Sequence, residues 1–174
     1  RTDEYLQILR AAWDTQGPRD FEGKYYRFGG FTPQVFPHQD RHLELFFGGS
    51  SPAAYVVGSK HADTYMLWGE PLKETSEQIA KVAEKAAEAG RAQRPRISVS
   101  FRPILGRTDD EAWERAHGIL DTINGTVGQQ FKEKVGQIHR QGHAPENTGS
   151  KRLLAVAEKG ELHDRCLWTP TTQA

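Results

Sequence analysis

The chain has 174 residues, a size typical of one domain. Its 23 Lys and Arg residues balance 23 Asp and Glu residues, so neither nucleic acid nor an anionic membrane is an expected partner. No apolar run approaches the roughly 18 residues of a membrane-spanning helix. The single cysteine, Cys166, excludes an internal disulfide framework. No secretory leader is visible, so the expected location is the cytoplasm.

The ends of the sequence and its apolar content favour a segment of a longer chain. The sequence begins at Arg1 inside a predicted helix, and its only methionine is Met66. Hydrophobic residues make up 36% of the chain, which is little material for a domain that should bury roughly 68–70% of its unfolded surface. The alternative is a processed or trimmed chain with natural ends.

The first 40 residues predict a helix and a hairpin. Apolar residues recur on one helical face over residues 3–13, which predicts an amphipathic helix that ends at Gly17-Pro18. Residues 21–28 predict a short hairpin with its turn at Gly23, and residues 29–40 a polar connector.

Residues 43–123 alternate three times between strand and helix patterns. The predicted strands are residues 43–47, 64–68 and 97–105, and the predicted helices are 53–61, 73–89 and one that runs from a Thr108–Glu111 capping box to 123. Such alternation indicates right-handed crossovers and a parallel sheet in sequential order. The second helix shows an apolar stripe, and Gly90 stands where a C′ glycine belongs. The stripe residues are Ile79, Val82, Ala83, Ala86 and Ala87.

The strand over residues 97–105 favours a barrel over a doubly wound sheet. One of its faces is apolar, and the other carries Ser98, Ser100 and Arg102. A central strand of a doubly wound sheet is usually apolar on both faces, whereas polar residues near a strand's carboxyl end suit the mouth of a (β/α)₈ barrel. Within this single predicted domain, residues 125–160 are expected to be a helical insertion or lid, with a polar stretch at 140–150.

The turn after the first predicted strand is the best candidate site. Gly48 and Gly49 leave room for a ligand to approach the backbone. Ser51 is expected to cap the following helix, with Pro52 at its first position. Free N–H groups and the helix dipole would then favour a phosphate, to which the hydroxyls of Ser50 and Ser51 could donate. An ordinary strand-to-helix turn has the same residue types, so both interpretations stay open.

Other candidates have functional and structural interpretations. Trp68, at the end of the second strand, would border a flat ligand or pack under the next helix. Arg102 would bind an anionic group or pair with a carboxylate inside the barrel. His139 and His143 have the spacing of a helical metal pair, but they lack the glutamate and the third ligand of such a site. Cys166 is expected to be a packed thiol.

Four short blocks of residues occur together along the chain. They are residues 20–26 (DFEGKYY), 46–51 (FFGGSS), 62–71 (ADTYMLWGEP) and 108–113 (TDDEAW). In this order and spacing they resemble the bacterial luciferase-like family of flavin-dependent monooxygenases, most of all its alkanesulfonate monooxygenase branch. The resemblance covers nearly all of residues 1–168 and is weakest over 125–150.

The resemblance implies an α/β fold, a partial TIM (β/α)₈ barrel with about strands five to seven and a helical insertion. It also implies reduced FMN supplied by a separate flavin reductase, with O₂ and a small organosulfur compound as substrates. The cofactor would carry the oxygen chemistry while the protein positions and shields it. A homo-oligomer is expected for the full-length protein.

The resemblance also assigns roles to residues. The flavin phosphate would lie at Gly48, Gly49, Ser50 and Ser51. Trp68 and Arg102 would be catalytic, and Ser100 would face the substrate.

One pair of positions departs from the sulfonate branch, which carries an arginine and a histidine two residues apart on the last of these strands. This sequence has Ser100 and Arg102 there, so sulfones, sulfide-derived compounds and other small molecules stay open as substrates. The other functions considered are a non-catalytic flavin-binding relative, a deazaflavin-dependent oxidoreductase and a segment with no activity of its own.

Overall fold

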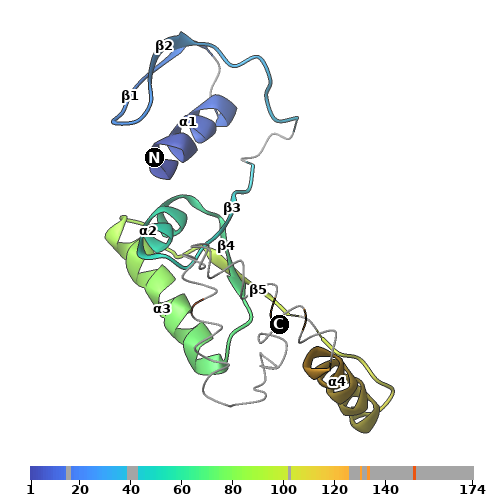
Figure 1. The fold of residues 1–174 in the computed structure, drawn as a ribbon. Helices are drawn as coiled ribbons and strands as arrows, with labels where there is room; N and C mark the ends of the chain where they lie inside the picture. Colours follow the sequence, from blue (N-terminus) through green and yellow to red (C-terminus); the bar gives the residue numbers. More distant parts are fainter. Residues whose placement is uncertain are drawn as a thin grey trace. The chain divides into compact units, whose positions relative to one another are not determined.

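The computed structural model describes residues 1–14, 17–38, 43–101 and 103–125, together with the single residues 130, 133 and 151. Figure 1 follows the chain through these parts. The chain divides into two compact units. The first contains residues 1–48, 52–66 and 80–98, and the second contains 49–51, 67–79 and 99–174. In the described part of the chain, no helix is long and apolar enough to cross a membrane.

The first unit opens with a helix and a hairpin, as the sequence predicts. Helix α1 (Thr2–Asp14) precedes the antiparallel strands β1 (Arg19–Glu22) and β2 (Arg27–Phe31). The Glu4 carboxylate of α1 accepts hydrogen bonds of 2.8–3.0 Å from the N–H groups of the hairpin turn, Lys24, Tyr25 and Tyr26. These hydrogen bonds tie the hairpin to the helix. Strand β2 continues to Phe31, whereas the sequence predicts a connector from residue 29 onward.

Strands and helices then alternate in the predicted order. Strands β3 (Phe46–Gly48), β4 (Thr64–Trp68) and β5 (Arg96–Ser100) form one sheet in the order β3-β4-β5. Helices α2 (Pro52–His61), α3 (Leu72–Glu88) and α4 (Asp109–Asn124) follow them in turn. Strands β3 and β4 are parallel, with Phe46 opposite Thr64 and Gly48 opposite Met66. The parallel sheet and the sequential strand order are therefore confirmed.

Two predicted strands differ from the observed ones. Strand β3 begins at Phe46, not at residue 43. The Leu45 N–H donates to the Asp63 carboxylate at 2.7 Å and is therefore not available to a neighbouring strand. Strand β5 ends at Ser100, not at residue 105. Pro103 has no N–H for a ladder, and it disfavours continued pairing.

The buried stripe of α3 also differs from the prediction. Thr75, Gln78, Val82 and Ala86 are buried, whereas Ala87 is exposed. The hydrophobic pattern predicts the wrong buried face because two of the buried residues, Thr75 and Gln78, are polar. The predicted glycine cap is confirmed: Gly90 has φ +79°, its N–H donates to the Ala87 carbonyl, and the Arg91 N–H donates to the Ala86 carbonyl.

The core of the first unit is aromatic. Tyr55 of α2 stacks on Tyr65 of β4, with ring centroids 5.8 Å apart and an interplanar angle of 10°. Phe47 of β3 lies against the same Tyr65 ring at 5.9 Å. Gly58 brings α2 close to these rings, since a Cβ there would lie 2.5 Å from atoms of both Phe47 and Tyr65. These contacts fix α2 against the sheet.

Helix α4 of the second unit begins at the predicted N-cap, Thr108, and the predicted capping box is observed in part, because Glu111 bonds to the residue before Thr108. The Thr108 hydroxyl accepts from the Glu111 N–H at 3.2 Å, and the Glu111 carboxylate accepts from the Arg107 N–H at 2.8 Å. Ala116 on its predicted apolar face is buried, while Trp113 is exposed. The predicted insertion at 125–160 and its polar stretch at 140–150 lie almost wholly outside the described residues.

Candidate functional site

The predicted site residues follow the carboxyl ends of the three parallel strands. Gly48 ends β3, Trp68 ends β4 and Ser100 ends β5. Gly49, Ser50 and Ser51 belong to the same compact unit as Trp68 and Ser100, and Gly48 belongs to the other. Arg102 lies outside the described residues.

The turn from β3 into α2 is short, and α2 begins at Pro52, the predicted first helical position. Three residues separate Gly48 from Pro52, the first residue of a ten-residue helix. Gly48 and Gly49 are exposed, and Ser50 and Ser51 are half-buried. A Cβ added at Gly48 would meet only Met66, at ordinary distances of 3.6 and 3.8 Å. The packing and backbone of the described chain therefore do not require glycine at this position.

Helix α2 is anchored along its length behind this turn. Tyr55, in the first turn of the helix, is buried against Tyr65, and the Lys81 ammonium lies 5.8 Å from the Tyr55 ring centroid. Burial raises the pKa of the Tyr65 hydroxyl, and the neighbouring Tyr55 raises it further, so Tyr65 is neutral at physiological pH. At the other end, Arg91 donates to the carbonyls of Ser59 and Ala62 at 2.9 and 2.7 Å. A cation at a helix C-terminus is favourable.

The turn after β4 combines an exposed aromatic ring with a buried carboxylate residue. Trp68 is 54% exposed, and Glu70, two residues later, is 3% exposed. The Gly69 N–H donates to the Ser100 carbonyl at 3.0 Å, so the ends of β4 and β5 lie side by side. Ser100 is exposed at this edge. Trp68 and Ser100 are thus close enough in the backbone to border one ligand.

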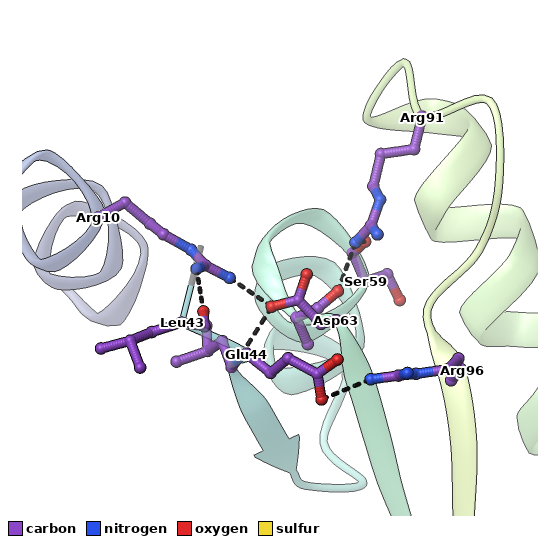
Figure 2. Close-up of polar contacts among 9 residues, drawn as sticks. Arg10, Leu43, Glu44, Ser59, Asp63, Arg91 and Arg96 are labelled. Carbon is purple, nitrogen blue, oxygen red and sulfur yellow. Dashed lines mark hydrogen bonds and ion pairs between the residues drawn. The ribbon is translucent and has the colours of Figure 1, made fainter. Parts of the chain in front are cut away.

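Sequence reasoning missed a polar cluster at the opposite end of β4. Asp63 accepts from Arg10 of α1 at 2.5 Å and from the Leu45 N–H at 2.7 Å, while Arg10 also donates to the Leu43 carbonyl. Figure 2 shows this cluster, with Arg96 of β5 reaching Glu44 nearby. Because the cluster lies at the amino end of the strand, we assign it to stability. The sequence signal was an aspartate directly before a strand, inside the block of residues 62–71.

No group of three or more His, Cys, Asp or Glu side chains within the described residues is arranged to hold a metal ion. His139, His143 and Cys166 lie outside those residues.

The fold and the turn invite comparison with known proteins. A model of the luciferase-like monooxygenase family matches residues 1–173. A riboflavin lyase, solved with modified FMN and riboflavin, has a TM-score of 0.60 and 22% identity over 69% of this chain and 31% of its own. A monooxygenase from Streptomyces bottropensis has a TM-score of 0.52 and 19% identity over 78% of this chain and 42% of its own.

A third solved structure is an F420-dependent secondary alcohol dehydrogenase in complex with an F420-acetone adduct. Its TM-score is 0.50, with 22% identity over 57% of this chain and 30% of its own. The chain therefore spans less than half the length of each of these proteins. At such identities the likeness shows the fold, an α/β arrangement of the luciferase-like barrel type that is covered in part. Because the family model matches almost the whole sequence, the chain belongs to the luciferase-like monooxygenase family.

Proposed function

We propose that this chain is part of a flavin-dependent monooxygenase that receives reduced FMN from a separate flavin reductase. Its substrates are O₂ and a small organosulfur compound such as an alkanesulfonate. The observation that carries the proposal is the β3–α2 turn, Gly48 to Pro52, at the carboxyl end of a parallel strand. The family membership supports the oxidoreductase class. The complete protein is proposed to be a cytoplasmic homo-oligomer whose barrel includes this segment.

The turn suits a phosphate group. Gly48 and Gly49 are exposed, so a ligand could approach their backbone. No acidic side chain occurs in residues 45–69 apart from Asp63, which is engaged with Arg10 at the other end of β4. The N-terminus of α2 adds partial positive charge, and Ser50 and Ser51 add hydroxyl donors. Gly48, Gly49, Ser50 and Ser51 would therefore hold the FMN phosphate.

The ends of β4 and β5 would form the wall of the substrate site. Bound reduced FMN supplies the electrons that activate O₂ for insertion into the substrate. The exposed Trp68 indole would exclude water from one side of that reaction. Ser100 would donate to a polar group of the substrate, and Arg102 would pair with an anionic one such as a sulfonate. A serine in place of an imidazole leaves sulfones and sulfide-derived compounds as further candidates.

A second candidate is a deazaflavin-dependent oxidoreductase. The similarity to the F420-dependent alcohol dehydrogenase, whose structure holds an F420-acetone adduct, supports this alternative. Titrating the protein with reduced FMN and with reduced F420, and then measuring O₂ consumption, separates the two. A monooxygenase binds FMN and consumes O₂ with substrate, whereas a deazaflavin enzyme binds F420 and consumes none.

The phosphate assignment is tested by a Ser50→Ala/Ser51→Ala variant of the complete protein. Hydrogen bonds to a charged group contribute roughly 1.5–3 kcal/mol each, so reduced FMN should bind at least about ten-fold more weakly. Reduced riboflavin, which lacks the phosphate, should lose little. Ser76→Ala, at an exposed position of α3, is the matched control and should change neither affinity. Equal weakening of FMN and riboflavin would show that these serines do not contact the phosphate.

A further inference from the structure

The turn that follows Trp68 is held by a buried hydroxyl. The Thr75 Oγ1 in the first turn of α3 donates to the Glu70 carbonyl at 2.9 Å. The Thr75 N–H donates to the Pro71 carbonyl, also at 2.9 Å. Thr75 is 8% exposed and Glu70 is 3% exposed, so water cannot readily replace the hydroxyl as the donor to this carbonyl.

The other side of the same turn is tied to β5. The Gly69 N–H donates to the Ser100 carbonyl at 3.0 Å. Two consecutive residues, Gly69 and Glu70, are thus fixed from two different elements, directly after the exposed Trp68. Trp68 is the last residue of β4, and its side chain is 54% exposed. The hydrogen bonds of Gly69 and Glu70 hold the backbone on its carboxyl side.

We infer that Thr75 is a positioning residue whose hydroxyl sets the place of the Trp68 indole beside Ser100, and thereby the affinity for the organic substrate. The effect on substrate affinity rests on the proposed function. The effect of Thr75 on the position of the Trp68 indole is independent of it.

The chemistry of the hydroxyl makes the inference specific. Valine has nearly the shape of threonine but no donor, so Thr75→Val leaves the Glu70 carbonyl buried without its side-chain hydrogen bond. The turn is then free to shift away from the helix, and Trp68 with it. Thr75→Ser keeps the hydroxyl and loses only a methyl group. A role in packing alone predicts that serine would be the worse replacement, whereas a positioning role predicts that valine is.

The chain offers a matched control on α4. The Thr122 Oγ1 donates to the Gly118 carbonyl at 2.9 Å, the same bond length, but at an exposed position of another helix. Thr122→Val removes an equivalent hydrogen bond without touching the Trp68 turn.

The experiment uses the full chain labelled with 5-fluorotryptophan and fluorine NMR, with the Trp68 signal assigned by its loss in Trp68→Phe. Thr75→Val should shift or broaden that signal, while Thr75→Ser and Thr122→Val leave it in place. In turnover assays, Thr75→Val should raise the KM for the organic substrate by about two- to ten-fold, the range of one net hydrogen bond. Its FMN affinity should stay within about two-fold of the wild type, because the proposed phosphate turn is not changed.

An unchanged Trp68 signal in Thr75→Val overturns the inference, as does an equal change in Thr122→Val. A shifted signal with an unchanged KM overturns the link to substrate affinity. If the complete wild-type protein binds no flavin, the proposed function fails, yet the fluorine spectrum still decides whether Thr75 positions Trp68.

Discussion

Gly58 lies directly over Tyr65. A Cβ at Gly58 would be 2.5 Å from the Tyr65 Cε2 and 2.5 Å from the Phe47 Cδ1, distances that real side chains do not adopt. The glycine therefore sets how closely α2 approaches β3 and β4. Helix α2 follows the proposed phosphate turn directly in the sequence.

Gly58→Ala should destabilise the protein although alanine is the better helix former. The propensity gain is about 1 kcal/mol, but the overlap with two buried rings costs about 1–3 kcal/mol and forces α2 to move. Gly118→Ala on α4 is the control, because a Cβ there meets nothing within 4 Å. It should raise the free energy of unfolding by about 0.5–1 kcal/mol. Urea unfolding of both variants measures this, and a stabilised Gly58→Ala would contradict the packing argument.

The pair formed by Arg10 and Asp63 should contribute to stability. Both side chains are largely buried, with 16% and 25% of their surfaces exposed. Removing the carboxylate leaves the Arg10 guanidinium and the Leu45 N–H without this acceptor. Asp63→Ala should therefore lower the free energy of unfolding by about 1.5–3 kcal/mol. A cycle with Arg10→Met should give a coupling energy above about 0.5 kcal/mol.

The hairpin pair of Arg27 and Glu22 is the control for this cycle. Its atoms approach to 2.6 Å, but its side chains are 73% and 72% exposed. Exposed ion pairs contribute little, so Glu22→Ala should change the free energy of unfolding by less than about 0.5 kcal/mol. If Asp63→Ala and Glu22→Ala lowered the free energy of unfolding equally, burial would not distinguish the two ion pairs.

Local sequence patterns predict most of the elements. Gly and Pro residues mark the turns after β3 and β4, and Thr108 with Glu111 marks the start of α4. Such signals act within a few residues of the chain, and a parallel order follows from the alternation of elements. The Gly48–Ser51 turn could be located for the same reason.

Contacts between distant residues could not be predicted in the same way. Arg10 and Asp63 are 53 positions apart, and the residues around either one do not indicate that the other is its partner. Thr75 and Gln78 resemble solvent-facing residues of a helix, yet both are buried. Hydrophobic periodicity considers only apolar residues, so it could not predict that these polar residues near the Trp68 turn are buried.

The stability that Asp3 contributes should disappear in acid. Partial burial raises the pKa of the Asp3 carboxyl, but donation from Lys60 and the neighbouring His61 outweighs it, and the pKa lies below its ordinary value of 3.8. The Asp3 Oδ1 is 2.8 Å from the Lys60 Nζ and 2.6 Å from the His61 Nε2. A lowered pKa in the folded state stabilises the protein above the unfolded value, and this contribution is lost as the pH falls through the folded value.

Asp3→Asn measures this contribution. Its unfolding free energy should lie below that of the wild type at neutral pH, and the difference should shrink as the pH falls below about 4. Urea unfolding of the wild type and of Asp3→Asn, from about pH 6 to about pH 3, measures this difference in the free energy of unfolding. A difference that is constant over this range would mean that the carboxylate charge does not stabilise the link between α1 and α2.

Gly48→Ala separates a ligand site from a structural turn. A new Cβ would meet Met66 at 3.6 and 3.8 Å, which is ordinary contact. Gly48 is not among the described glycines with positive φ, which are Gly17, Gly30 and Gly90, so alanine adopts its backbone without strain. The free energy of unfolding should therefore change by less than about 0.5 kcal/mol. If the flavin phosphate approaches this backbone, the added methyl group should weaken the binding of reduced FMN by about ten-fold or more.

Comparison with Gly58→Ala makes the outcome decisive. That variant should lose stability first and flavin affinity only as a consequence, whereas Gly48→Ala should keep its stability and lose affinity. Urea unfolding and an anaerobic titration with reduced FMN, on the same preparations of the full chain, give both quantities. A Gly48→Ala protein that is stable and binds FMN as tightly as the wild type would exclude close approach of the phosphate at Gly48. The proposed site would then have to lie further along the turn, at Ser50 and Ser51.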